Sequence, residues 1–197
     1  MTRTRLGILI SGAGTNMAAI IEAARASNYP AHPVLVVSNR PDAAGLQWAK
    51  DVGVETAIVD HKSSGGDREA FERCIDAELR AAGVELVALA GFMRILTPWM
   101  VGRWAGRMVN IHPSLLPKYK GLHTHARALD AGDEVHGCSV HWVSQGVDEG
   151  SVIAQAEVPV FAGDNPETLA ARVQSAEHKL YPEAIRLACA ALQQGSA

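Results

Sequence analysis

The amino-acid sequence predicts an α/β fold: a doubly wound, mostly parallel sheet flanked by helices, with an antiparallel addition in the C-terminal third. Three observations lead to this prediction. Short apolar runs alternate with amphipathic helical patterns through the first half of the chain. Each run is apolar at consecutive positions, as is usual for strands that are covered on both faces. In the last third, two strand-like runs flank a short polar loop, which is typical of an antiparallel hairpin.

Four strands and three helices are expected in the first half. The strands are expected at residues 6–10, 34–37, 56–59 and 86–90, and the helices at residues 17–26, 43–51 and 68–82. Gly53 and Gly83 follow the second and third helices, where glycine commonly ends a helix. The segment His61–Asp67 is polar and contains glycine, so we expect it to be a loop.

The pattern changes after residue 96. Thr97 is expected to cap a short helix that begins with Pro98. Three more strands are expected, at residues 108–111, 139–143 and 152–158, and the loop Ser144–Gly150 joins the last two. A final helix is expected from Pro166. Pro182 is expected to kink or split this helix, because proline lacks a backbone N–H.

Length and composition fit one domain over residues 1–197, with a nucleotide-binding-type half over residues 1–107 and a second half over residues 108–197. The net charge of -3 disfavours nucleic-acid binding, which needs a basic face. No apolar run is long enough to span a membrane, and the run near the N-terminus is too short for a signal peptide. A cytoplasmic protein without nucleic-acid or membrane partners is therefore expected.

Neither a disulfide framework nor a metal site is expected. Cys74, Cys138 and Cys189 lie far apart and form no CxxC pair. A cluster of histidines lies in the second half of the chain, but its spacing matches no recognised zinc site. Its members are His123, His125, His136 and His141.

The first strand runs into a glycine-containing turn, Gly12-Ala13-Gly14. Backbone N–H groups at a helix N-terminus can bind a phosphate, although a plain structural turn explains the same residues. Met17 stands where a dinucleotide fingerprint has its third glycine, and no acidic residue ends the second strand. NAD binding is therefore disfavoured. NADP binding stays open, because Arg40 could meet a 2′-phosphate.

Asn110 and His112 lie two residues apart near the end of an expected strand, so their side chains face the same side of the sheet. The carboxyl ends of strands in such sheets bind ligands. An amide can donate a hydrogen bond to an oxyanion, and an imidazole can transfer a proton near neutral pH. A capping asparagine beside a structural histidine remains an equal alternative. Asp148 lies in a polar loop, and spacing alone does not place it beside His112.

Five ordered segments resemble the folate-dependent formyltransferase family, in particular its phosphoribosylglycinamide formyltransferases. The segments are Gly91–Leu96, Asn110–Pro117, Gly121–His125, Asp148–Gly150 and Gln174–His178. The resemblance extends over nearly the whole chain. It implies transfer of the formyl group of 10-formyltetrahydrofolate, a co-substrate, to the amine of glycinamide ribonucleotide in purine biosynthesis. The transfer is expected to be direct, through a tetrahedral intermediate, without a metal.

The resemblance also implies roles for individual residues, and it makes residues 108–197 the catalytic and folate-binding half. The implied catalytic residues are Asn110, His112 and Asp148. The implied binding residues for glycinamide ribonucleotide are Gly14, Thr15, Asn16, Gln174 and Glu177. The implied folate-binding residues are Arg68, Met93, Arg94, Ile95, Leu96, Asn110, Ser144, Gln145, Gly146, Val147 and Asp148. Three positions depart from the family pattern. Thr15 replaces a residue that is often serine and keeps the hydroxyl, Cys138 replaces an expected threonine, and Ala176 replaces an expected polar residue.

Other functions remain as alternatives. A 10-formyltetrahydrofolate hydrolase would use the same three catalytic residues with water as the acceptor. A non-catalytic nucleotide- or folate-binding module would use only the implied binding residues and not the catalytic ones. An NADP-dependent oxidoreductase is a further alternative, based on Arg40. The sequence is compatible with a monomer or a homodimer.

Overall fold

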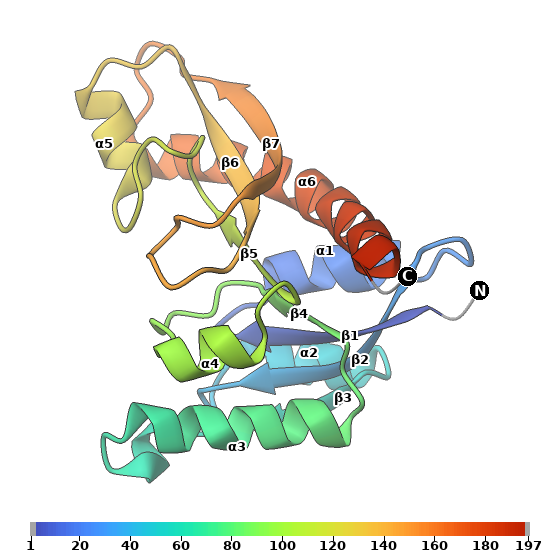
Figure 1. Ribbon diagram of the computed structural model, residues 1–197. Helices are drawn as coiled ribbons and strands as arrows, with labels where there is room; N and C mark the ends of the chain where they lie inside the picture. The colour runs from blue at the N-terminus through green and yellow to red at the C-terminus, as the bar shows by residue number, and fades with distance from the viewer. Residues whose placement is uncertain (1–2, 196–197) are drawn as a thin grey trace.

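The computed structural model describes residues 3–195 (Figure 1). Its elements follow one another in the order β1 (Thr4–Ile10), α1 (Thr15–Ala23), β2 (Ala31–Ser38), α2 (Ala44–Asp51), β3 (Glu55–Ile58), the 3-10 helix η1 (His61–Ser64), α3 (Arg68–Ala81), β4 (Leu86–Leu89), α4 (Pro98–Arg103), β5 (Met108–His112), α5 (Thr124–Asp130), β6 (Val135–Trp142), β7 (Val152–Pro159) and α6 (Pro166–Gly195).

The strands form one seven-stranded sheet in the order β3-β2-β1-β4-β5-β6-β7. Neighbouring strands from β3 to β5 are parallel, whereas β6 and β7 run antiparallel to their neighbours. The expected fold class is therefore confirmed. The chain leaves β1 toward β2 on one side and returns to β4 on the other. Such a switch in strand order opens a crevice at the carboxyl ends of the strands.

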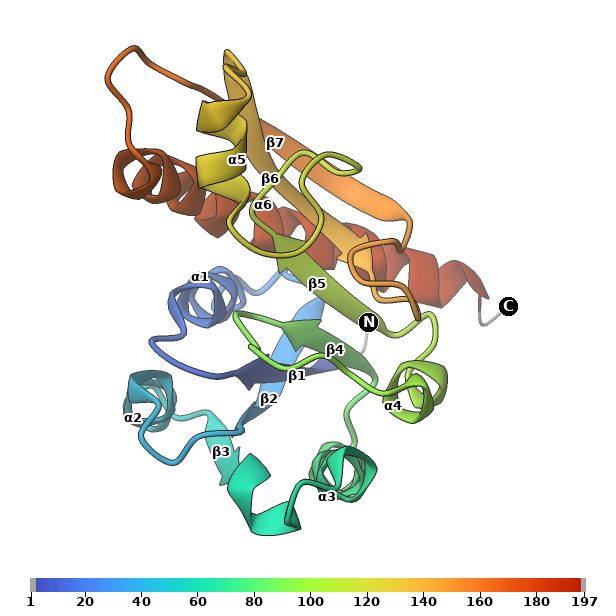
Figure 2. The same ribbon diagram turned by 90° about the vertical axis from the view of Figure 1, so that its left-hand side faces the viewer.

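Helices cover both faces of the sheet. Figure 2 shows α1 and α2 on one side of the parallel strands and α3 and α4 on the other. The side chains of β1 alternate accordingly: Ile8 and Ile10 pack in the apolar cluster under α1 and α6, and Leu9 packs in the cluster under α3. Burial on both faces explains why the strands are apolar at consecutive positions.

Helix α6 continues through Pro182 as a single helix, so the expected split is wrong. Tyr181, Ala184 and Ile185 are fully buried against the sheet on either side of the proline. Their burial stabilises the helical path by more than the one backbone hydrogen bond that the proline removes. In the described part of the chain, no helix combines the length and the apolar character needed to cross a membrane.

Two short elements were not expected from the sequence. Helix η1 forms inside the polar loop, where the Asp60 side chain accepts a hydrogen bond from the Lys62 N–H at 3.0 Å. Helix α5 follows His123, whose φ of 58° lies in the left-handed region. Next to α5, the Nδ1 atom of His125 lies 3.2 Å from the Nε2 atom of His136, which is buried in β6. The expected division of the chain at residues 107 and 108 stays a prediction.

The Tyr181 hydroxyl attaches α6 to the centre of the sheet. It lies 2.9 Å from the carbonyl oxygen of Leu89 in β4 and 3.2 Å from that of Val109 in β5. We expect Tyr181→Phe to lower the free energy of unfolding by about 1–2 kcal/mol, because a buried hydrogen-bonding hydroxyl is lost without a change in shape. Urea denaturation of both proteins measures this difference. An unchanged midpoint would contradict it.

Burial, together with the neighbouring His125, lowers the pKa of His136 to about 4, while Asp133 and a backbone carbonyl oppose the shift. The unfolded chain therefore binds this proton more readily than the folded protein does. Stability is complete above the ordinary pKa of 6.5 and is lost as the pH falls toward 4. We expect a loss of about 2 kcal/mol between pH 7 and pH 5. In denaturant titrations His136→Gln should flatten this dependence, and an equal slope would refute the assignment.

Candidate active site

Strand β5 and the loop between β6 and β7 bring three predicted residues together. Asn110 and His112 lie on β5, with Ile111 between them. Asp148 comes from the loop, which folds back toward the sheet. Its φ of 53° is unusual for a residue with a side chain and costs roughly 1–2 kcal/mol. Such backbone strain persists where the surrounding contacts hold a side chain in place.

His112 is buried between two oxygen acceptors. Its Nδ1 atom lies 3.3 Å from Oδ2 of Asp148, and its Nε2 atom lies 2.9 Å from the carbonyl oxygen of Tyr119. A carbonyl oxygen only accepts hydrogen bonds, so Nε2 carries a proton. A carboxylate accepts as well, so the arrangement is fully satisfied when Nδ1 is also protonated. The contact between His112 and Asp148, which spacing alone did not predict, is present.

Asp148 is held as a carboxylate. Burial raises its pKa, but hydrogen bonds with His141 and the Gly121 N–H, together with the charge on His112, outweigh burial and leave the pKa below its usual range. The Gly121 N–H donates to Oδ2 at 2.9 Å. The segment after β5 thus supplies backbone groups to both the carboxylate and the imidazole.

His141 is a site residue that sequence reasoning missed. It is only 3% exposed, and its Nδ1 atom lies 2.9 Å from the Trp142 carbonyl oxygen. Its Nε2 atom lies 3.3 Å from Nδ2 of Asn110 and 3.5 Å from Oδ1 of Asp148. The ring can accept from the amide or, when protonated, donate to the carboxylate. The signal that could have found it is the antiparallel register, which places His141 directly opposite Asn110.

The predicted phosphate loop meets helix α6. Gly14 has a φ of 71° and precedes α1. Beyond it, the Nδ2 atom of Asn16 donates to Oε2 of Glu177 at 2.8 Å, and Nε2 of Gln174 lies 3.3 Å from Oγ1 of Thr15. Burial raises the pKa of Glu177, and the Asn16 hydrogen bond partly opposes this. The five residues predicted for one substrate therefore form one group, although they lie about 160 positions apart in the chain.

The first predicted folate segment extends from the end of β4. Arg68 donates to the carbonyl oxygen of Ile95 at 2.8 Å, and the Met93 N–H donates to Oγ of Ser11 at 2.8 Å. The side chains of Met93 and Ile95 are 71% and 64% exposed. Apolar side chains at such exposure on a hydrogen-bonded segment provide a surface for an apolar ligand. Arg94, between them, is half-buried.

The second predicted folate segment is the loop that carries Asp148. The Ser144 hydroxyl lies 3.4 Å from the Gly146 carbonyl oxygen, Gln145 is exposed, and Val147 is 51% exposed. Leu96 and Val143, which adjoin the two segments, pack against the same apolar cluster under α3 and α4. No hydrogen bond between the two segments was found among the described residues, so their joint role in folate binding stays a prediction.

Comparison with models of protein families shows which family the chain belongs to. The model of the formyl transferase family matches residues 4–185. The chain belongs to that family. This match covers both the parallel half of the sheet and the antiparallel strands that carry the site.

Individual members of the formyl transferase family are similar over most of the chain. The phosphoribosylglycinamide formyltransferase of Escherichia coli (strain K12) is 50% identical over 175 residues, which cover 89% of this chain and 82% of the relative. The crystal structure of the Brucella melitensis enzyme of that name is 48% identical with a TM-score of 0.91, covering 96% of this chain and 97% of that one. The trifunctional purine biosynthetic protein adenosine-3 of Drosophila melanogaster is 46% identical over 187 residues, which cover 94% of this chain but only 14% of that longer protein.

The histidines considered as metal ligands separate into different environments. His125 and His136 contact each other, whereas His141 contacts Asn110 and Asp148. Within residues 3–195, no three histidine, cysteine or acidic side chains are grouped so that they could hold a metal ion.

The loop before α1 allows a test with a matched control. A Cβ atom at Gly14 would lie 2.9 Å from the Met17 side chain and 3.2 Å from the Gly45 backbone, at a positive φ. A Cβ atom at Gly12 would meet nothing within 4 Å. We expect Gly14→Ala to cost roughly 1–2 kcal/mol of stability or more, and Gly12→Ala to change it by less than about 0.5 kcal/mol. Denaturant unfolding measures both, and equal effects would contradict the loop geometry.

Proposed function

We propose that the chain transfers the formyl group of 10-formyltetrahydrofolate to the amine of glycinamide ribonucleotide, a step in purine biosynthesis. The observation that carries the proposal is the contact of Asp148 with His112 and, through His141, its link to Asn110. The loop at Gly14–Asn16 follows β1 at the same end of the parallel strands. Membership of the formyl transferase family and the names of the E. coli and Brucella relatives support this reaction.

The proposed reaction is a direct transfer. The neutral amine nitrogen attacks the formyl carbon and forms a new C–N bond, and the formyl oxygen gains a negative charge. As this charge develops, the Nδ1–H of His112 shifts from Asp148, 3.3 Å away, toward the oxyanion, and the second N–H of the Asn110 amide donates to it as well. The bond between the formyl carbon and the folate nitrogen then breaks, and the proton lost by the amine passes to that nitrogen. Asp148 orients His112 through its Nδ1 atom and accepts or relays the moving proton.

Glycinamide ribonucleotide occupies the group formed by the phosphate loop and α6. The backbone N–H groups of Gly14, Thr15 and Asn16 lie at the N-terminus of α1, where a phosphate is stabilised by unpaired donors and the helix dipole. Gln174 and Glu177 close the pocket from α6. A substrate with both an amine and a phosphate is therefore held at two points, which orients the amine.

The folate co-substrate binds against the segments at 91–96 and 144–148. Exposed apolar side chains on both segments contact its ring system, and Arg68 lies where it can pair with the acidic glutamate tail. The residues that carry this chemistry need no metal ion and form no covalent intermediate. The protein acts in the cytoplasm as a monomer or a homodimer.

A 10-formyltetrahydrofolate hydrolase would release formate without an amine. The assay that separates the two functions follows loss of formyl-folate with and without glycinamide ribonucleotide. Transfer predicts that turnover depends on the amine and that formyl glycinamide ribonucleotide accumulates. Equal turnover in its absence would overturn the proposal in favour of hydrolysis.

We expect His112→Ala to lower kcat by about 10²–10³-fold, because one donor to the oxyanion is lost. Binding of a folate analogue, measured by calorimetry, should change little. His32→Ala on β2 is the matched control, since His32 is exposed and distant in the sheet order from β5. A kcat that survives the loss of His112 would remove the imidazole from the mechanism and favour a binding module.

A further inference from the structure

The acceptor on the Nε2 side of His112 comes from a residue with an unusual backbone. Tyr119 lies in the segment between β5 and α5, and its φ of 54° is in the left-handed region that tyrosine rarely adopts. Its carbonyl oxygen lies 2.9 Å from Nε2 of His112. Something beyond the local chain must hold this conformation, and the Tyr119 side chain shows what does.

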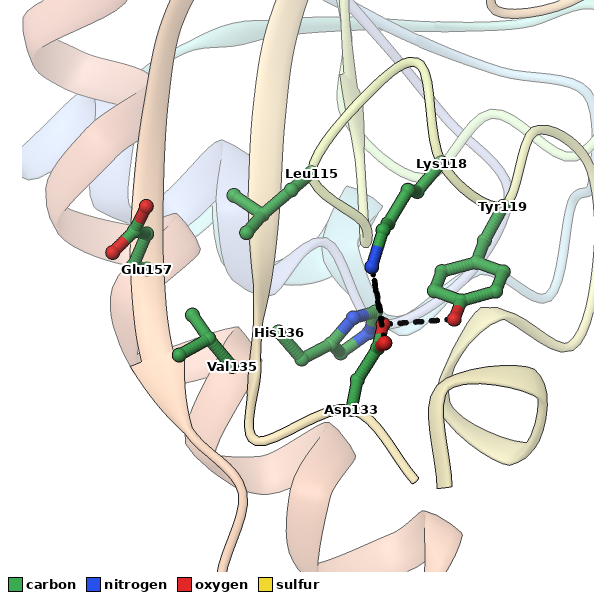
Figure 3. A pocket seen from close by; sticks show the side chains of 7 residues that line it. All are labelled: Leu115, Lys118, Tyr119, Asp133, Val135, His136 and Glu157. Atoms are coloured by element: carbon green, nitrogen blue, oxygen red, sulfur yellow. Dashed lines mark hydrogen bonds and ion pairs between the residues drawn. The ribbon is translucent and has the colours of Figure 1, made fainter. Parts of the chain in front are cut away.

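The Tyr119 side chain lines a surface hollow of about 380 Å³, where its hydroxyl points toward Asp133 (Figure 3). Its hydroxyl donates to Oδ2 of Asp133 at 2.8 Å. The Lys118 ammonium group lies 3.0 Å from each oxygen of the same carboxylate. These two donors hold the pKa of Asp133 below its usual range, the tyrosine hydroxyl having the larger effect. Asp133 thus anchors two consecutive residues of the segment.

The ring of Tyr119 is fixed on its other sides as well. The Arg127 guanidinium carbon of α5 lies 5.2 Å from the ring centroid, and the ring of His136 lies edge-on at 6.1 Å. A ring held by a hydrogen bond at its tip and by contacts at its sides cannot turn independently of its backbone. The Ser114 hydroxyl also donates to the Lys118 carbonyl oxygen at 2.6 Å and lies 3.5 Å from that of Tyr119. The position of the Tyr119 carbonyl oxygen is therefore set by this local contact together with the contacts of the Tyr119 side chain.

We propose that Asp133 is a positioning residue for catalysis: by holding the Tyr119 hydroxyl, it places the Tyr119 carbonyl on Nε2 of His112 and so directs Nδ1 toward Asp148 and the reacting carbon. The inference rests on the proposed function, because it needs His112 as the group that faces the formyl oxygen. Neither Asp133 nor the Tyr119 hydroxyl touches His112 directly. They act only through one backbone oxygen.

The orientation of His112 depends on this oxygen for a physical reason. An imidazole with one anchored N–H keeps a single ring orientation and presents its other nitrogen in a known direction. Without the carbonyl, Nε2–H loses its acceptor, and the ring can rotate or exchange its neutral tautomers. Asp148 alone, at 3.3 Å, leaves the ring free to pivot about that contact. The result is an enzyme that binds both substrates but aligns the donor to the oxyanion less often.

The first test compares Tyr119→Phe and Asp133→Ala with Asp133→Asn. We expect the first two to lower kcat by about 10–100-fold, the range for second-layer residues that orient a working histidine, with KM for both substrates within about twofold. Asp133→Asn retains an oxygen acceptor for the hydroxyl and should recover most of the rate. Glu157→Gln is the control, because Glu157 lines the same hollow but is exposed and belongs to β7. A kcat unchanged in Tyr119→Phe would overturn the proposal.

The second test asks whether the effect passes through His112. In a His112→Ala background, Tyr119→Phe should change the residual single-turnover rate by less than about twofold, because the group being positioned is absent. An equal loss in both backgrounds would show that the hydroxyl acts by another route and would overturn the proposal. Failure of the proposed function itself would appear separately, as a wild-type protein without amine-dependent turnover.

A third measurement needs no activity. In protein labelled with ¹⁵N-histidine, the His112 signals should report a protonated Nε2 in the wild type and exchange between tautomers in Tyr119→Phe. Loss of the signals in His112→Asn assigns them. Identical His112 spectra in the wild type and Tyr119→Phe would contradict the proposal even if the rates differed.

Discussion

The candidate site depends on β5 having a parallel neighbour on one side and an antiparallel neighbour on the other. This strand pairs in parallel with β4 on one side and antiparallel with β6 on the other. The antiparallel register puts His141 opposite Asn110, and the hairpin that follows returns the chain to place Asp148 beside His112. A parallel strand in place of β6 would have needed a long crossover connection and could not have delivered a carboxylate from a short hairpin loop.

Most of the fold could be predicted from residue pattern, because burial on both faces leaves a clear apolar run in each parallel strand. The less regular parts of the fold could not be predicted in this way. β6 begins at Val135, four residues earlier than predicted, since Gly137 and His136 interrupt its apolar pattern. The split at Pro182 was wrong because long-range burial of the surrounding side chains outweighs a local preference. Helix α5 lies in a segment whose glycines and histidines resemble a loop.

The residues of the candidate site were likewise only partly predictable from the sequence. Alternation along a strand predicted that Asn110 and His112 share a face, and the family resemblance supplied Asp148 and the α6 residues, which no spacing could connect to Gly14. The carbonyl of Tyr119 and the N–H of Gly121 lay beyond either approach. Every residue except proline has both a backbone N–H and a carbonyl group, so the sequence does not indicate which of these groups the fold uses. His141 could have been found only after the strand register was known.

The continuity of helix α6 has a consequence for selectivity. Glu177 stands one turn before Tyr181, whose hydroxyl lies between carbonyl oxygens of β4 and β5. One continuous helix therefore joins the proposed phosphate-binding residues to the strand that carries Asn110 and His112. The distance between the proposed phosphate-binding residues and the residues on β5 is therefore fixed by the fold. Under the proposed function, a molecule whose amine lies one bond nearer to its phosphate, or one bond farther away, could engage either set of residues but not both together.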